Sequence, residues 1–154
     1  PRPRSPRYSF FINVRAIAAY LALADGDQVK PTDYQQATAL KLAAAAARTM
    51  KSYAKADELT ARIPIDAERK NAEMLNMLAQ RKPQDVIERF GAEDLTKWPF
   101  WAAGEGYLAR ARAYAAAGDK SKSDADFNAA LELTSDNRVR AEILKALGKK
   151  SDEK

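Results

Sequence analysis

The sequence predicts an all-α protein, and two patterns along the chain support this prediction. Apolar residues recur at helical spacing in every apolar stretch, and no stretch alternates between apolar and polar residues as a strand does. Alanine, the strongest helix former, fills an unbroken run over 43–47. We therefore expect seven or eight helices that pack as antiparallel neighbours.

The first helix is expected over 8–24. Its apolar face comprises Phe10, Val14, Ile17 and Leu21. The stretch also has some features of a signal peptide, with basic residues before it and small residues at its end. Because Arg15 interrupts the apolar run, we interpret the stretch as a helix of the domain that docks on the helices after it.

Capping residues and apolar spacing define the remaining helices. They are expected over 33–50, 52–62, 67–81, 84–91, 100–117, 120–133 and 138–147. Thr32 or Asp33 can cap the helix that begins at 33, and Asp66 the helix that begins at 67. Gly118 suits a helix end that needs a positive φ. A single helical turn is expected at 93–95.

We expect one helical domain over 8–147, because 154 residues fit a single domain with a real core. An extended Pro/Arg arm precedes it over 1–7, where proline at every second or third position disfavours helix. This arm either contacts an acidic partner or serves as a linker. The start at Pro1 suggests a processed product or an excised domain. A charged tail over 148–154 is expected to be disordered.

Residues 107–133 carry aromatic and small residues at fixed offsets around the turn at Gly118. The aromatic residues are Tyr107, Tyr114 and Phe127, and the small residues are Ala111, Ser123 and Ala130. This stretch resembles one tetratricopeptide repeat (TPR), a helix-turn-helix unit of about 34 residues. Two positions depart from the family pattern. Arg110 stands where the family buries a leucine, which indicates weaker packing or a contact that the family lacks. Ser135 stands where the family has its terminating proline.

Two weaker copies precede this repeat. The first comprises Leu40, Ala44, Ala47, Tyr53, Ala56 and Ile63, and the second Met74, Met77, Leu78, Val86, Ile87 and Phe90. Ala56, Val86 and Ser123, taken as equivalent, lie 30 and 37 residues apart. The resemblance implies a right-handed α-α superhelix, or solenoid, of about three degenerate TPR-like hairpins with an N-terminal helix and a C-terminal capping helix. The alternative is an unrelated helical bundle that contains one repeat-like hairpin.

The composition removes the side chains that most often carry catalysis. The chain has no cysteine and no histidine, which excludes thiol nucleophiles, thiolate metal sites and serine–histidine pairs. No glycine-rich phosphate loop or calcium loop occurs. Asp124 and Asp126 fall on opposite sides of a helix, and Glu93 and Asp94 are expected at the surface. We therefore expect no enzymatic activity, no cofactor and no metal site. A metal site of scattered acids stays open as an alternative.

The net charge of +5 results from 26 basic and 21 acidic residues that are interleaved along the chain. This pattern favours a mixed, solvated surface over a nucleic-acid interface. No apolar run approaches 18 residues, so we expect a soluble protein without a membrane-spanning helix. The compartment is not indicated.

Three aromatic residues, Trp98, Phe100 and Trp101, stand where the well-formed repeat begins. Buried aromatic rings contribute strongly to protein cores. We therefore expect these rings to fill the joint between the helices at 84–91 and 100–117. The alternative is an aromatic ligand pocket.

The tetratricopeptide resemblance also suggests a binding surface, because the family lines its concave face with the first helix of each repeat. Carried over by position, these groove residues are Lys41, Arg48, Asn71, Leu75, Leu108 and Arg112. Lys41, Asn71 and Arg112 have the chemistry to clamp a terminal carboxylate, as in some family members; the alternative is that they are merely solvated.

The function implied is a protein- or peptide-interaction module or scaffold whose partner is acidic or carboxylate-terminated. Two alternatives remain. The chain is an accessory helical domain of a larger, even enzymatic, polypeptide, or it binds nucleic acid.

Overall fold

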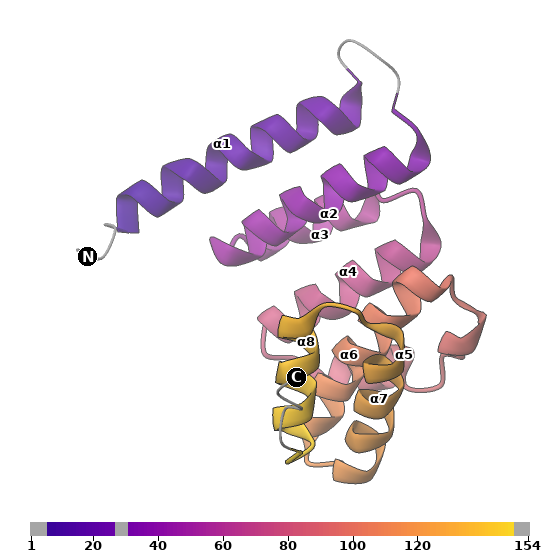
Figure 1. Cartoon of the computed structure of the whole chain (residues 1–154). Coiled ribbons are helices and arrows are strands. Elements are labelled where there is room, and N and C mark those ends of the chain that lie inside the picture. The colour runs from indigo at the N-terminus through magenta and orange to yellow at the C-terminus, as the bar shows by residue number, and fades with distance from the viewer. Residues whose placement is uncertain (1–5, 27–30, 150–154) are drawn as a thin grey trace. The chain divides into compact units, whose positions relative to one another are not determined.

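The all-α class is confirmed. A computed structural model describes the backbone of residues 6–26 and 31–149 and the side chains of residues 15–26 and 31–149. Of the described residues 79% are helical, and none lies in a strand. The helices are α1 (Pro6–Asp25), α2 (Asp33–Thr49), α3 (Tyr53–Ala61), α4 (Asp66–Ala79), α5 (Pro83–Phe90), the 3-10 turn η1 (Leu95–Lys97), α6 (Phe100–Ala117), α7 (Lys120–Leu133) and α8 (Asn137–Ala146) (Figure 1). Every predicted α-helix is present, with both ends within two residues of the prediction.

The N-terminal arm is shorter than predicted. Helix α1 begins at Pro6, so the last two residues of the predicted extended arm over 1–7 are helical. Proline is tolerated in the first turn of a helix, where its missing N–H would have no intrahelical partner. The rest of the arm, 1–5, lies outside the described residues.

The predicted tail also begins too early. Gly148 has a φ of +67°, and the amide of Lys149 donates to the carbonyl of Leu144 over 2.8 Å. These contacts end α8 in the manner of a glycine cap. The remainder of the predicted tail, 150–154, lies outside the described residues.

Two predicted helix starts differ in how they are capped. Thr32 caps α2 as predicted, because its hydroxyl accepts from the amide of Gln35 over 3.3 Å and the Gln35 side chain accepts from the Thr32 amide over 2.9 Å. The predicted cap at Asp66 is wrong. Asp66 is the first residue of α4, and its carboxylate pairs with Arg69 and Lys70 one turn ahead. An acid in the first turn still stabilises the helix dipole.

The single turn predicted at 93–95 occurs two residues later, as η1. Asp94 fixes its start, because its carboxylate accepts from the amide of Thr96 over 3.2 Å. Glu93 precedes the turn, and its carboxylate accepts from the indole N–H of Trp98 over 3.1 Å. The acids predicted to be simple surface residues therefore shape this connection.

The chain divides into two compact units, Pro1–Gln80 and Arg81–Lys154. The division falls inside the range 8–147 that the sequence assigned to one domain. It also separates α4 from α5, the two helices of the second weaker repeat copy.

Unit 1 is built around α2, which packs on α1, α3 and α4. Each of α2 and α3 runs antiparallel to the helix before it (Figure 1). Its core is rich in small residues: Ala37, Ala39, Leu40, Ala43, Ala44, Ala47, Ala56, Leu59, Ile63 and Ala72. The predicted docking of α1 is confirmed for its C-terminal half, where Ala24 is buried and Ile17 and Leu21 pack on this core. The side chains of Phe10 and Val14 lie outside the described residues.

Unit 2 is built around the antiparallel hairpin of α6 and α7. Gly118 joins these helices in the left-handed conformation, with a φ of +82°, as predicted. The predicted small positions Ala111 and Ala130 are both buried and pack with Phe127 and Ile143. The Ser123 hydroxyl donates to the carbonyl of Ala111 over 3.1 Å, which joins the two helices at a pair of small residues.

The link from α7 to α8 ends the hairpin without the proline that tetratricopeptide repeats carry. Thr134 is extended after the last residue of α7. Asp136 then caps α8, because its carboxylate accepts from the amides of Arg138 over 2.8 Å and Val139 over 3.3 Å. Side-chain hydrogen bonds of Asp136 therefore fix the start of α8 directly after Ser135.

The buried position of Ala111 generates a prediction about side-chain volume. We expect Ala111→Leu to destabilise the chain by about 1–3 kcal/mol, because a fully packed contact has no room for added methylenes. Ala116→Leu is the matched control, since Ala116 is exposed on the same helix. Thermal unfolding measures both variants, and an equal fall in Tm would show that the hairpin packs through a different face.

Candidate functional site

The predicted groove residues of unit 1 lie on α2 and α4, which pack together. The ammonium of Lys41 pairs with Glu68, whose side chain is only 7% exposed. Asn71 is buried, at 1% exposure, so its amide is not available to a partner at the surface, contrary to the prediction. Leu75 is half-buried. Burial follows from the register of α4, which turns Asn71 inward together with Ala67 and Met74.

Arg48 belongs to a polar network that joins three helices of unit 1. Its guanidinium donates to the side-chain carbonyl of Asn76 over 2.9 Å, and the Asn76 amide donates to Asp57 over 2.8 Å and to Thr60 over 3.1 Å. Asn76 is 1% exposed. Burial lowers the pKa of Arg48 below its ordinary value. The network links α2, α3 and α4, so it stabilises the unit and leaves Arg48 half-buried.

The predicted groove residues of unit 2 lie one turn apart on α6. Arg112 donates to the Glu142 carboxylate of α8 over 3.0 Å through Nε and 2.5 Å through Nη2. Leu108 packs on the buried cluster of Ala111, Phe127, Ala130 and Ile143. This face of α6 therefore contacts α8 and has part of its apolar surface covered.

All three predicted groove cations thus have partners within the chain. Lys41 and Arg112 pair with carboxylates, and Arg48 donates to an amide. A carboxylate-terminated ligand would need to displace these partners. The six residues also fall into two sets, four in unit 1 and two in unit 2.

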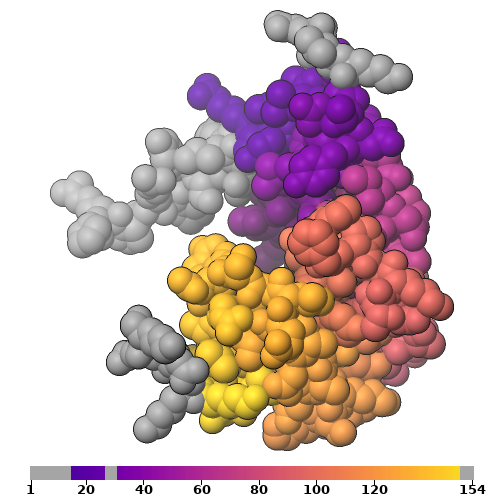
Figure 2. All heavy atoms as spheres, turned by 45° about the vertical axis from the view of Figure 1, so that its right-hand side comes forward, coloured from indigo at the N-terminus to yellow at the C-terminus, as the bar shows by residue number. Residues whose placement is uncertain are grey.

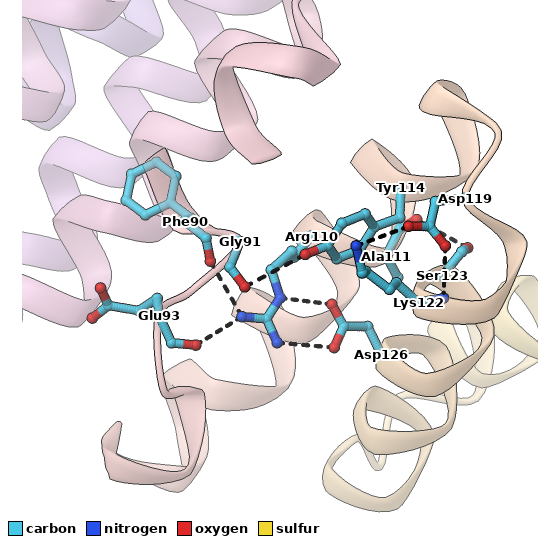
Figure 3. Close-up of polar contacts among 10 residues, drawn as sticks. All are labelled: Phe90, Gly91, Glu93, Arg110, Ala111, Tyr114, Asp119, Lys122, Ser123 and Asp126. Carbon is cyan, nitrogen blue, oxygen red and sulfur yellow. Dashed lines mark hydrogen bonds and ion pairs between the residues drawn. The ribbon is translucent and has the colours of Figure 1, made fainter. Parts of the chain in front are cut away.

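A second cluster forms around Arg110, the residue that departs from the repeat pattern (Figure 3). Its guanidinium makes a two-pronged ion pair with Asp126 of α7, with Nε to Oδ2 at 2.7 Å and Nη2 to Oδ1 at 2.9 Å. Nη1 donates to the carbonyls of Phe90 over 3.2 Å and Glu93 over 2.7 Å. Arg110 is 9% exposed, and Asp126 is 7% exposed.

The surroundings of Arg110 keep it charged. Burial alone would lower the pKa of Arg110, but the hydrogen bonds and negative charge of Asp126 outweigh burial and leave the pKa above its ordinary value. The Tyr107 ring also lies beneath the guanidinium, with its centroid 5.6 Å from Cζ. The hydrogen bonds of Arg110 hold the α5–η1 connection against the α6–α7 hairpin. We therefore interpret this cluster as a structural clamp.

The neighbouring contact of Tyr114 supports the same connection. Its hydroxyl donates to the Gly91 carbonyl over 3.4 Å (Figure 3). A Cβ at position 91 would lie 2.4 Å from the carbonyl oxygen of Ile87 and 3.1 Å from the Tyr114 hydroxyl. Glycine is therefore required where the chain leaves α5.

Two of the three predicted core aromatics are at the surface. Phe100 is 71% exposed and Trp101 is 51% exposed, so the prediction that they fill the joint before α6 is wrong. Trp98 is half-buried and bonds to Glu93. Pro99 precedes the first turn of α6, and the helical rotation after it turns the next two rings outward.

The exposed rings border a hollow of about 360 Å³ in unit 2, which we name the aromatic pocket. It is lined by Phe100, Trp101, Gly104, Glu105, Leu108, Ala130, Leu133, Thr134, Ser135, Asp136 and Val139. The faces of α6, α7 and α8 form one continuous surface from orange to yellow in the space-filling view (Figure 2). The sequence signal for this pocket was the group of aromatic residues Trp98, Phe100 and Trp101. An aromatic ligand pocket was the alternative to the prediction that these rings fill a joint between helices.

A second hollow, of about 440 Å³, lies in unit 1 between α1 and α2. It is lined by Tyr20, Leu23, Pro31, Tyr34, Gln35, Thr38, Ala39 and Leu42. This lining is apolar apart from the side chains of Gln35 and Thr38. Leu23, Tyr34 and Leu42 are at least 45% exposed. No charged side chain is among the described residues that line it, so the hollow offers little to select one partner.

The described residues show no group of three or more acids that could hold a metal ion. Within the same ranges, none of the helices combines the length and apolar character that crossing a membrane requires. Comparisons with known proteins find no matching family model, curated protein or solved structure. The resemblance of residues 107–133 to a tetratricopeptide repeat therefore stays a prediction.

The Arg110 clamp generates a prediction about coupling. We expect Arg110→Met or Asp126→Leu alone to cost about 3–5 kcal/mol, because each leaves a buried charge without its partner. The double variant removes both charges and should cost clearly less than the sum of the single variants. Urea unfolding of the three variants measures this coupling.

The matched control is the exposed pair Arg112 and Glu142, whose side chains are 38% and 51% exposed. Arg112→Met and Glu142→Leu should show coupling of about 1 kcal/mol or less. Additive costs at Arg110 and Asp126 would contradict the clamp.

Proposed function

We propose that this chain is a protein- or peptide-interaction module without enzymatic activity, built from degenerate TPR-like hairpins in a right-handed superhelix. The α6–α7 hairpin supports this proposal, because Ala111, Ser123 and Ala130 occupy the close contacts that such repeats need. The left-handed turn at Gly118 is also in the position that the repeat pattern requires.

The observation that carries the binding function is the aromatic pocket. Phe100, Trp101 and Leu133 expose large apolar side chains around one hollow. Apolar residues grouped around a concavity mark interaction sites more often than scattered ones do. Aromatic residues are also enriched among those that contribute most to binding energy. The volume of about 360 Å³ suits one or two side chains of a partner and falls at the lower end of known ligand pockets.

The groove residues support binding less directly. Lys41 in unit 1 would hold an acidic or carboxylate-terminated segment by exchanging Glu68 for the carboxylate of the partner, and Arg112 in unit 2 would do so separately by exchanging Glu142. Such an exchange replaces one ion pair by another and yields little net free energy. The contacts therefore favour the aromatic pocket as the main source of affinity.

A peptide-display selection on the full chain tests this function. We expect enriched peptides that form 1:1 complexes with a Kd that is roughly micromolar. At a free peptide concentration of about 100 Kd, mass action stabilises the folded chain by about 2.7 kcal/mol, which raises its Tm. Thermal unfolding with each synthesised peptide measures this shift, and a scrambled peptide is the control.

The same measurement separates the proposal from nucleic-acid binding. Single- and double-stranded oligonucleotides at low salt should leave the Tm unchanged, because acids are interleaved with the cations of this chain. If oligonucleotides raise the Tm and no peptide does, the chain is a nucleic-acid-binding protein instead.

A further inference from the structure

The first helix of unit 1 is apolar on every side over most of its described length. Between Arg15 and Asp25, α1 consists of alanine, leucine, isoleucine and a single tyrosine, Tyr20. Among the described residues of unit 1, α1 packs on α2 and on no other helix (Figure 1). A helix that is apolar all round is normally buried on more than one side. One side of α1 therefore lacks the cover that is usual for such a helix.

Solvent exposure divides α1 into two faces. The inner face packs on the core of unit 1 through Ile17, Tyr20, Leu21 and Ala24. The exposed residues over 15–24 recur at spacings of three and four, so they form one stripe, which we name the outer face of α1. This face comprises Arg15, Ala18, Ala19, Ala22 and Leu23. Leu23 is 64% exposed and also borders the hollow of unit 1, so the outer face and the hollow join into one apolar surface.

The last helix of the chain is built differently. The exposed side of α8 carries Arg138, Glu142 and Lys145. Terminal helices of repeat proteins need a polar outer side of this kind to remain soluble. The outer face of α1 has a single charged residue, Arg15, at one end. This composition suits burial against another protein surface.

The hollow alone does not select a partner, but the charges at the two ends of α1 do. Arg15 is exposed and has no ion pair or hydrogen bond with another described residue. At the other end, Asp25 pairs with Arg62 of α3, and the last turn of α1 contains no basic residue to offset the negative pole of the helix dipole. The outer face thus has a positive end, a neutral centre and a negative end.

Two copies of this face complement each other only when the helices run antiparallel. Each Arg15 then approaches the negative pole of the other helix, and the neutral centres meet. A parallel arrangement would place the two Arg15 side chains next to each other and would align the two dipoles. The charge distribution therefore favours a twofold contact between identical faces.

We propose that the chain forms a symmetric dimer in which the outer face of α1 packs antiparallel on the same face of a second copy. The twofold axis passes between positions 20 and 21, at the centre of the four apolar residues. Ala19 then meets Ala22 of the second copy, and Ala18 meets Leu23. The small side chains at the centre allow the two helices to approach closely. This inference goes beyond the proposed peptide-binding function and does not depend on it.

Sedimentation equilibrium of the full chain tests whether the dimer exists. The outer face is small, so we expect a weak monomer–dimer equilibrium with a Kd on the order of 100 μM. A chain that remains monomeric at about 1 mM overturns the proposal.

Paired charge substitutions test the register. Ala19→Lys and Ala22→Glu each place a charge in the apolar centre and should each weaken dimerisation by about tenfold or more. When the two variants are mixed, the introduced lysine faces the introduced glutamate, so a heterodimer should form with nearly the original Kd.

The matched control is Ala54→Glu, which makes the same change at an exposed alanine of α3, a helix that packs on α2 and α4. It should leave dimerisation unchanged. Lysine and glutamate are good helix formers, so the three variants should unfold at nearly the Tm of the original chain when each is dilute enough to be monomeric.

Three further outcomes overturn the inference. Self-association that Ala22→Glu leaves intact places the dimer interface elsewhere. Folded variants that do not dimerise when mixed rule out the antiparallel register. A monomeric chain that binds phosphatidylcholine vesicles, and loses this binding through Ala22→Glu, assigns the outer face to a lipid surface. The peptide-display measurement tests the proposed function separately, so either proposal can fail without the other.

Discussion

The buried ion pair between Arg110 and Asp126 is the constraint on which unit 2 depends. Two prongs of the guanidinium hold α6 to α7, and the third reaches the carbonyls of Phe90 and Glu93 at the end of α5. A leucine here would pack the hairpin but would leave those carbonyls without this donor. A single side chain therefore holds both the hairpin and the connection that enters it. Trp98 through Trp101 come directly after that connection in the chain.

Helix positions and close contacts could be predicted from the sequence because they depend on local patterns. Apolar spacing and alanine content located every α-helix, and Gly118 marked a turn that needs a positive φ. Ala111 and Ala130 were predicted at helix contacts because only small residues allow two backbones to approach closely. Capping was harder, since Asp66 could stand before or inside the first turn, and only the backbone register decides between the two.

The candidate site was predicted less well, because a sequence does not show which helix covers which face. Asn71 is buried by the packing of α4, and Arg112 meets Glu142, which is 30 residues away in the chain. Long-range ion pairs of this kind carry no local signal. The positions of the aromatic residues were mispredicted for a related reason. Trp98 precedes Pro99 and is half-buried, whereas Trp101 lies in the first turn of α6 and is exposed, although the two residues have the same chemistry. Arg110 was flagged only as a departure from a repeat pattern, and its four hydrogen bonds became visible with the fold.

Native-state hydrogen exchange of Arg110→Met, compared with the unsubstituted chain, tests the clamp most directly. If Arg110 ties the α5–η1 connection to the hairpin, amides over 91–98 should exchange much faster in the variant, through local opening that leaves the centres of α2 and α3 unaffected. Arg112→Met should leave the same amides unchanged. Unaltered protection over 91–98 in Arg110→Met would contradict the account, since the connection would then be held without Arg110.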